Sequence, residues 1–258
     1  MRLAFAQIET IVNNKRYNLD KVIDYLHTAK KDKADIALFP ELVLTGYSIG
    51  PWLRETAETL DGPSVYTIQK VCKQLNISTI FSFPEFEKGN YFVTSAFINE
   101  HGNLVGIYRK THLYDEEKIY FSRGDKFPLF ETSYGSIGIM SSFDLEFPEV
   151  ARILCMKGAD LILIPTTNMY PYREYQQIYI QSRAMENEVP FALCNRIGPE
   201  GKLTFIGGST FVDARGITHF LLNEEEKLIT IPVLLFKNAN PKSKLALNRN
   251  PDLIKKLY

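Results

Sequence analysis

Short apolar runs alternate along the chain with segments whose apolar residues recur every three or four positions. The short runs are typical of buried strands, and the periodic segments are typical of amphipathic helices. Helices are predicted after a cap at Asn13 or Asn14, after Pro63, after Pro148 and over residues 173–187. Strands are predicted at residues 2–8, 34–40, 77–83, 137–140, 158–165 and 191–195. This order predicts an α/β protein.

The second half of the chain repeats the order of the first. Residues 34–40 and 159–165 both read Ala-Asp-x-x-Leu-x-Pro, and each half continues into a predicted hairpin, at residues 91–108 and 204–222. A last strand is predicted at residues 228–235. Two such halves predict a four-layer α-β-β-α sandwich, in which two mixed sheets pack face to face with helices outside.

We expect residues 1–258 to form a single domain, because α/β domains often reach this length. The last part of the chain, residues 237–258, has mixed charge, two prolines and little apolar periodicity. We expect it to lie on the surface or against a partner subunit rather than in the core.

Composition narrows the possible functions. Thirty basic and thirty acidic residues cancel, so no net field favours nucleic acid or an anionic membrane, and no apolar run is long enough to cross a bilayer. The four histidines lack metal-ligand spacing. Cys72, Cys155 and Cys194 lie in apolar segments without Cys-x-x-Cys spacing, which predicts buried, reduced thiols in a cytoplasmic protein.

The segment 138–149 is the strongest candidate for chemistry. An apolar strand runs into Ser141 and Ser142, and Pro148 then opens a helix. A turn of this kind presents a side chain close to backbone N–H donors. Glu41 follows a predicted strand directly, Lys110 ends a hairpin strand, and Glu117 lies in a run of charged residues. Each of these three, taken alone, is better explained as a surface charge.

Together these segments resemble the nitrilase superfamily of carbon–nitrogen hydrolases. The resemblance lies in Pro-Glu-Leu-Val-Leu-Thr-Gly-Tyr at 40–47, Tyr-Arg-Lys-Thr-His-Leu at 108–113 and Gly-Ile-Met-Ser-Ser-Phe-Asp-Leu-Glu-Phe-Pro-Glu at 138–149. Residues 183–187 and 207–216 resemble further blocks of the family, so the match extends from residue 1 to about 235. It implies the same four-layer sandwich and an enzyme that acts on linear amides without a metal or organic cofactor.

The resemblance also implies a role for each matching residue. Glu41 would be the general base, Lys110 would stabilise the tetrahedral oxyanion, and Glu117 would position the substrate and hold the lysine. The backbone N–H of Phe143 would complete the oxyanion hole. An amide carbonyl under attack needs these functions: removal of a proton, compensation of the oxyanion and protonation of the leaving ammonia. We therefore expect Ser142 Oγ, a carboxylate oxygen of Glu41 and Lys110 Nζ to lie within hydrogen-bond range of one another.

Ser142 departs from the family, which has a cysteine nucleophile at this position. A serine hydroxyl is much less acidic than a thiol and normally needs a histidine base, so we expect a loss of several powers of ten in rate. Three explanations remain open: an engineered Cys→Ser substitution, a natural pseudoenzyme that binds an amide-like ligand or a partner protein, and a working serine variant. Ser141 also departs from the usual apolar residue. A triad of Ser142, His219 and Asp213 is formally available, but no Gly-x-Ser-x-Gly elbow surrounds Ser142.

The predicted pocket loops are rich in aromatic side chains, which suits a small and partly apolar amide. The block 44–50 resembles the amidase-like branch of the family, and a carbamoyl compound or a nitrile remains an alternative substrate. The resemblance implies at least a homodimer, with residues 172–180 as a candidate contact. The residues expected to bind substrate are Tyr47, Tyr114, Asn168 and Met169, and Trp52, Tyr170 and Tyr172 are further candidates for the rim.

Overall fold

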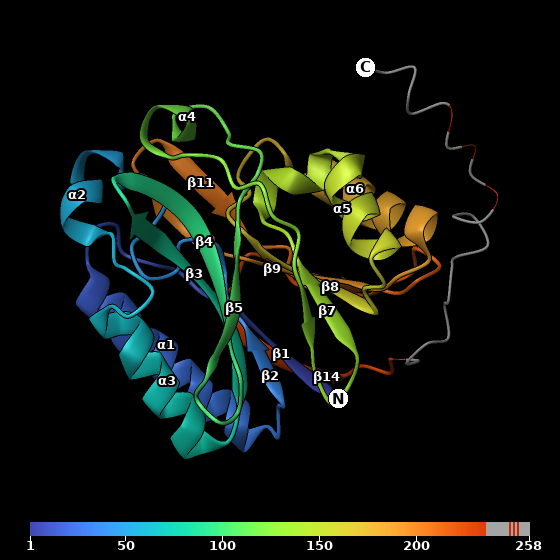
Figure 1. Cartoon of the computed structure of the whole chain (residues 1–258), viewed down its shortest axis with the longest axis horizontal. Coiled ribbons are helices and arrows are strands. Elements are labelled where there is room, and N and C mark those ends of the chain that lie inside the picture. The colour runs from blue at the N-terminus through green and yellow to red at the C-terminus, as the bar shows by residue number, and fades with distance from the viewer. Residues whose placement is uncertain (236–247, 249, 251, 253–258) are drawn as a thin grey trace.

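Two mixed sheets lie at the centre of the protein in the computed structural model, which describes residues 1–235, 248, 250 and 252 (Figure 1). Within these residues each large sheet has six strands. The first has the order β14-β1-β2-β3-β4-β5 and the second the order β13-β12-β9-β8-β7-β6. In both sheets three parallel strands (β1, β2, β3 and β7, β8, β9) stand in the middle, with antiparallel strands on either side. The internal repeat seen in the sequence is therefore a repeat of topology.

The strands of the first sheet are β1 (Arg2–Gln7), β2 (Ile36–Leu38), β3 (Ser78–Glu87), β4 (Asn90–Ile98), β5 (Leu104–Arg109) and β14 (Lys227–Pro232). Those of the second are β6 (Leu129–Glu131), β7 (Ser136–Ile139), β8 (Leu161–Thr166), β9 (Phe191–Asn195), β12 (Thr210–Val212) and β13 (Thr218–Leu221). A separate hairpin consists of β10 (Ile197–Glu200) and β11 (Leu203–Ile206).

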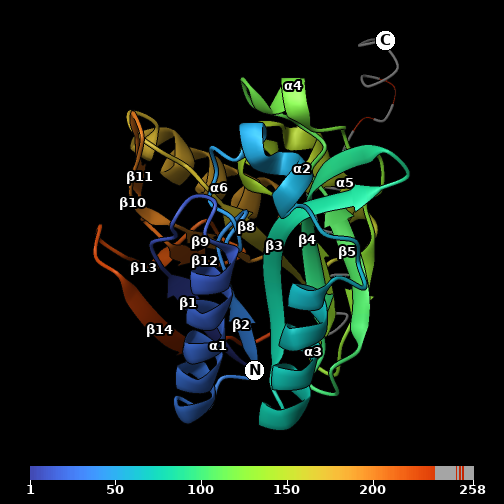
Figure 2. The same cartoon turned by 90° about the vertical axis from the view of Figure 1, so that its left-hand side faces the viewer.

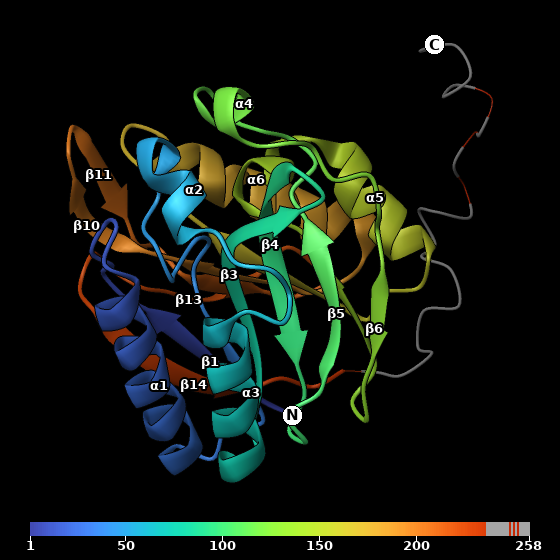
Figure 3. The same ribbon diagram turned by 60° about the vertical axis from the view of Figure 1, so that its left-hand side comes forward.

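Four long helices form the two outer layers. Helices α1 (Lys15–Lys31) and α3 (Pro63–Leu75) lie side by side over the first sheet, as Figures 2 and 3 show. Helices α5 (Pro148–Met156) and α6 (Arg173–Asn187) cover the second sheet. The predicted four-layer sandwich is confirmed. None of the helices in the described residues is long and apolar enough to cross a membrane.

Short helical segments connect these layers near one end of the sheets. They are η1 (Gly50–Trp52), α2 (Leu53–Thr56), α4 (Glu117–Tyr120) and η2 (Ser142–Glu146). The hydrophobic pattern does not predict α2 or α4, because four residues are too few for a helical period to show.

Side-chain alternation along β1 explains how the layers adhere. Leu3 and Phe5 are fully buried between the sheets, in a cluster that also contains Ile139 of the second sheet. Ala4 and Ala6 point the other way, into a cluster with residues of α1 and α3. Because successive strand residues face opposite sides, a strand buried on both faces is apolar throughout. This is why the sequence shows short continuous apolar runs.

Helix α1 begins where its cap was expected. The side chain of Asn14 accepts a hydrogen bond from Tyr17 N at 3.2 Å, so Asn14 is the capping residue. The neighbouring Asn13 adopts a positive φ of 56° in the turn before the helix.

The predicted hairpin at residues 204–222 is wrong in detail. Its first strand is interrupted, because Gly207 and Gly208 have φ of 60° and 70° and turn the chain between β11 and β12. Strand β11 instead pairs with β10, which was not predicted, and β12 pairs with β13. The expected surface or interface segment 237–258 lies outside the described residues, apart from 248, 250 and 252.

The turn at Gly207 yields a stability prediction. A Cβ at Gly207 would lie 2.7 Å from the carbonyl oxygen of Asn223, whereas a Cβ at Gly201, with nearly the same φ of 61°, meets nothing within 4 Å. We expect Gly207→Ala to lower the free energy of unfolding by about 2–4 kcal/mol, from backbone strain plus the clash. Gly201→Ala should lower it by only about 1–2 kcal/mol, from strain alone. Urea denaturation of both variants measures the difference, and equal losses would contradict the role of the close contact.

Candidate active site

The candidate residues come together where strands of both sheets end. Glu41 follows β2, Lys110 follows β5, and Ser142 begins η2 just after β7. The backbone N–H of Glu41 donates to the carbonyl of Thr166 in β8 at 3.3 Å. The carboxyl ends of parallel strands are where α/β folds place their sites, because several chain segments leave the sheet at one edge.

Lys110 is buried between two carboxylates. Its Nζ lies 2.9 Å from Oε1 of Glu41 and 2.8 Å from Oε1 of Glu117, and no side chain of the three is more than 4% exposed. The other carboxylate oxygen of Glu117 accepts a hydrogen bond from Tyr114 N at 2.9 Å. We call Glu41, Lys110 and Glu117 the charge trio. Two carboxylates and one ammonium give it an excess of negative charge in a place without bulk water.

The protonation of the trio follows from these contacts. Burial alone would lower the pKa of Lys110, but the attraction of Glu117 and Glu41 outweighs it, and the net shift is upward. Burial raises the pKa of the Glu117 carboxyl, against the opposing effect of Lys110, because one ammonium is shared between two carboxylates. Lys110 is therefore a permanent cation, able to face a developing oxyanion.

Glu41 is held by donors on both of its oxygens. Ser141 Oγ donates to its Oε1 at 2.8 Å, beside Lys110, and Thr167 Oγ1 donates to its Oε2. Ser141 and Thr167 belong to the second sheet and its loops, whereas Glu41 and Lys110 belong to the first. These contacts therefore join the two halves of the sandwich at the site.

Ser142 stands apart from these contacts. Its Oγ accepts a hydrogen bond from Thr167 N at 3.4 Å and makes none to Glu41 or Lys110 among the described residues. The expected approach of Glu41 and Lys110 is confirmed, but the expected hydrogen-bond contact of Ser142 Oγ with them is wrong. Ser141, not Ser142, occupies that contact.

The backbone explains why the two serines differ. Ser142 has a φ of 42°, which is rare for a residue with a side chain, whereas Ser141 is in the extended region. The sharp turn between them leaves Ser141 fully buried and directs Ser142 to the pocket. Phe143 follows in the first turn of η2, where backbone N–H groups have no acceptor within the helix.

Asp144 fixes this turn to the segment that carries Lys110. Its buried carboxylate accepts hydrogen bonds from Tyr108 Oη at 2.6 Å, Thr111 Oγ1 at 2.7 Å and His112 N at 2.9 Å. It also accepts one from Ser141 N at 3.2 Å. The sequence shows an acid in this turn but not its partners, which come from a segment more than 30 positions earlier.

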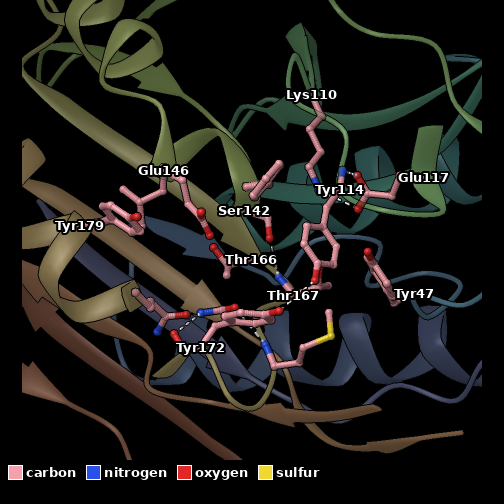
Figure 4. A pocket seen from close by; sticks show the side chains of 15 residues that line it. Tyr47, Lys110, Tyr114, Glu117, Ser142, Glu146, Thr166, Thr167, Tyr172 and Tyr179 are labelled. Atoms are coloured by element: carbon pink, nitrogen blue, oxygen red, sulfur yellow. Dashed lines mark hydrogen bonds and ion pairs between the residues drawn. The ribbon is translucent and has the colours of Figure 1, made fainter. Parts of the chain in front are cut away.

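A pocket of about 630 Å³ opens beside Ser142, and Figure 4 shows the side chains that line it. Of the expected rim, Tyr47, Tyr114, Asn168, Met169 and Tyr172 line the pocket, whereas Trp52 and Tyr170 do not. Lining residues that sequence reasoning did not assign include Glu146, Thr167, Gln176 and Tyr179.

A buried ion pair holds the loop that carries Tyr47. Arg196 Nη1 lies 2.5 Å from Oε2 of Glu200, and both side chains are almost fully buried. The Glu200 carboxylate accepts hydrogen bonds from the backbone N–H groups of Tyr47 and Ser48, at 3.0 and 2.5 Å. The hairpin β10–β11 therefore positions one wall of the pocket. The hydrophobic pattern of the sequence does not predict this hairpin.

The other candidate nucleophile arrangements are not assembled. His219 Nε2 lies 3.2 Å from Asp213 Oδ2, but both belong to the region of the β12–β13 hairpin and neither lines the pocket. Cys72 and Cys194 are fully buried and Cys155 is partly buried against the core, so none of the three faces the pocket. Within the described residues no group of three or more His, Cys, Asp or Glu side chains could hold a metal ion.

Comparison with known proteins agrees with this geometry. The family model described as carbon-nitrogen hydrolase matches residues 2–235. A probable nitrilase of Schizosaccharomyces pombe is 36% identical, over 99% of this chain and 97% of that protein. An (R)-stereoselective amidase of a Pseudomonas species is 30% identical, over 88% of this chain and 82% of that protein. The crystal structure of an amidase from a Nesterenkonia species superposes with a TM-score of 0.91 at 27% identity, over 100% of this chain and 96% of that one.

The charge trio yields a prediction about stability and pH. Lys110→Met would leave two buried carboxylates without their ammonium, so we expect it to lower the free energy of unfolding at pH 7 by about 3–5 kcal/mol. Without the cation, nothing opposes the burial that already raises the pKa of the Glu117 carboxyl above its unfolded value. The variant should therefore regain stability relative to the native chain as pH falls and this carboxyl binds a proton.

Denaturant unfolding of the native chain, Lys110→Met and Lys118→Met between pH 5 and 8 measures this effect. Lys118 is exposed and serves as the matched control, with an expected change of at most about 0.5 kcal/mol. A deficit of Lys110→Met that does not shrink at low pH would show that lost packing, not uncompensated charge, is responsible.

Proposed function

The chain belongs to the carbon–nitrogen hydrolase family, and from this premise we propose that it binds a small carboxamide and hydrolyses it to a carboxylate and ammonia. One observation carries the proposal. A permanently charged lysine is buried between two carboxylates at the wall of a pocket, beside a side chain held on a strained turn. This arrangement supplies a cation for an oxyanion, a carboxylate for proton transfer and a position for a nucleophile.

The proposed roles follow the geometry. The side chain at position 142 attacks the carbonyl carbon, and Glu41 accepts its proton and passes it to the leaving ammonia. Lys110 Nζ and the N–H of Phe143 stabilise the oxyanion, and Glu117 holds Lys110 in place. A water molecule that gives its proton to Glu41 then attacks the acyl carbon, and this proton returns to the side chain at position 142 as the carboxylate leaves. The hydrogen bond between Thr167 N and Ser142 Oγ supports this reading, because it orients the side chain in the pocket.

The wall of the pocket supports a small amide as the substrate. Aromatic side chains form much of this wall, and the pocket volume of about 630 Å³ includes open space at the entrance, so the enclosed part is smaller. Structures of the Nesterenkonia amidase contain butyramide and acrylamide, and one shows acrylamide added at its active site cysteine. These ligands support short carboxamides as the substrate class, with carbamoyl compounds and nitriles as alternatives.

Serine at position 142 is proposed to make this site slow. Glu41 would have to accept a proton from a hydroxyl that is much less acidic than a thiol. In addition, Oε1 of Glu41 is already engaged by Ser141 and Lys110, Oε2 is engaged by Thr167, and neither oxygen has a hydrogen bond to Ser142 in the described part of the chain. This last observation favours a second candidate function, a catalytically silent protein that retains an amide-binding pocket.

Replacement of the Ser142 oxygen by sulfur distinguishes the two candidate functions, a slow amidase and a silent binding protein. We expect Ser142→Cys to raise kcat/KM for acetamide, propionamide and butyramide by roughly 10²–10⁴, because the thiol ionises far more readily. Release of ammonia measures the rate. Ser141→Cys is the matched control: its side chain is buried outside the pocket, so it should not activate the enzyme.

Two outcomes would contradict the proposal in different ways. If Ser142→Cys stays inert over the series while retaining the fold, the chain is a binding protein rather than a silenced amidase. If the native chain already turns over at about 10 s⁻¹, which is ordinary for an enzyme, serine at position 142 does not slow the site.

The proposal includes assembly into at least a homodimer and work in the cytoplasm. Within the candidate contact 172–180, Tyr175 is 53% exposed and Ile178 is 61% exposed, and both lie one turn apart on α6, so they form a small apolar patch that a second copy of the chain would cover. Three unpaired cysteines support a reducing compartment.

Light scattering of Ile178→Glu tests the contact. A charge at the centre of an apolar interface is costly, so we expect this variant to be a monomer while the native chain is at least a dimer. Ile119→Glu, in exposed α4, is the control and should leave the assembly unchanged. A native chain that is monomeric at micromolar concentration would refute the proposed dimer.

A further inference from the structure

Glu146 is an acid in the pocket that the proposed reaction does not use. It is the last residue of η2, and Figure 4 shows it with Tyr179 on the opposite side of Ser142 from Lys110 and Glu117. Its carboxylate makes no hydrogen bond or ion pair with any other residue that the structure describes, and the residue is half-buried at the wall of the pocket. A half-buried carboxylate without a partner in the protein keeps its hydrogen-bonding capacity for a ligand.

The position of Glu146 is fixed even though its carboxylate is unpaired. Arg183 donates to the backbone oxygens of Leu145 and Glu146, at 3.1 and 3.0 Å. The charge of Arg183 is engaged elsewhere, by Glu186 at 3.2 Å and over the ring of Tyr179 at 5.5 Å from its centroid. Burial accordingly raises the pKa of Glu146, and no cation compensates for it. The protein thus holds the backbone in place and leaves the carboxylate free for a ligand.

The surroundings of Glu146 favour a cation. Tyr172 and Tyr179 also line the pocket, and aromatic faces attract cations, as the guanidinium of Arg183 over the ring of Tyr179 illustrates. The charge balance points the same way. The site contains one ammonium, Lys110, against the carboxylates of Glu41, Glu117 and Glu146, so its excess charge is negative.

We propose that Glu146 binds a protonated amino group of the substrate, and that the substrate is therefore an amide with an ammonium group on its far end. This inference rests on the proposed function and adds the substrate's charge to it. Ser142 and Glu146 are the first and last residues of the 3₁₀ segment, about 8 Å apart along its axis. An aliphatic chain of a few methylenes between the carboxamide and the ammonium spans that distance.

Three amides of similar length and different charge test the inference. They are γ-aminobutyramide, which is a cation at pH 7, valeramide, which is neutral, and succinamate, which is an anion. Titration calorimetry with the native chain measures binding, and ammonia release by Ser142→Cys measures kcat/KM. We expect γ-aminobutyramide to exceed valeramide by at least about tenfold in both, since a hydrogen bond to a charged group is worth that much. Succinamate should be the weakest.

Variants at two neighbouring acids assign the effect to Glu146. Glu146→Gln should bring the ratio of γ-aminobutyramide to valeramide close to one. Glu149→Gln removes the same charge from an exposed residue at the start of α5 and should leave the ratio unchanged. If both variants lose the preference equally, the general charge of the surface is responsible and the inference is overturned. If Glu146→Gln fails to fold, the order of the three amides on the native chain still decides.

The outcomes separate this inference from the proposed function. If valeramide is bound and hydrolysed as well as γ-aminobutyramide, Glu146 does not recognise a cation, and amide hydrolysis stands. If Ser142→Cys hydrolyses none of the three but the native chain binds γ-aminobutyramide in a manner that depends on Glu146, hydrolysis is refuted and cation recognition stands.

Discussion

A single ammonium shared by two buried carboxylates governs the rest of this structure. Lys110 cannot lie in a dry interior unless Glu41 and Glu117 face it, and neither carboxylate is stable there without Lys110. Glu41 is in turn tied to the second sheet through Ser141. The trio therefore requires both halves of the sandwich to be in place. The trio forms only if several segments meet at one point. These are the ends of strands β2 and β5, the start of helix α4 at Glu117 and the turn after β7.

The sequence predicts the sandwich well because its layers rest on patterns that extend over many residues. A strand buried on both faces is apolar over its length, and a helix over a sheet shows an apolar face, so both signals accumulate. The failures are short features. The chain turns at Gly207 and Gly208 because both adopt positive φ, which a pattern of apolar residues does not record. Hairpin β10–β11 and helices α2 and α4 are each too short to show a period.

Some contacts of the site are predictable from the sequence motifs, and others are visible only in the folded structure. The blocks around Glu41 and Lys110 predicted their contact, since strands in one sheet with ends at one edge bring these residues together. The blocks did not show which of two adjacent serines faces Glu41. That depends on one backbone angle at Ser142 and on Thr167, which lies across from it. The unpaired state of Glu146 was equally hidden, because it depends on where Arg183, 37 positions away, directs its charge.

The two ends of the pocket differ in how their charges are satisfied, and this separates the proposed catalysis at the charge trio from the proposed recognition at Glu146. The trio is paired within the protein, so its dipoles and charges are already oriented when a carbonyl arrives, which is how enzymes stabilise charge that develops late. Glu146 is not paired, so its interaction is realised only when a ligand supplies a cation, and that interaction contributes to binding. In the proposed reaction, a hydroxyl rather than a thiol at position 142 affects the end that contains the charge trio and leaves the end that contains Glu146 intact. A chain of this design can lose turnover and still select its ligand by charge, which is why binding and rate have to be measured separately at this site.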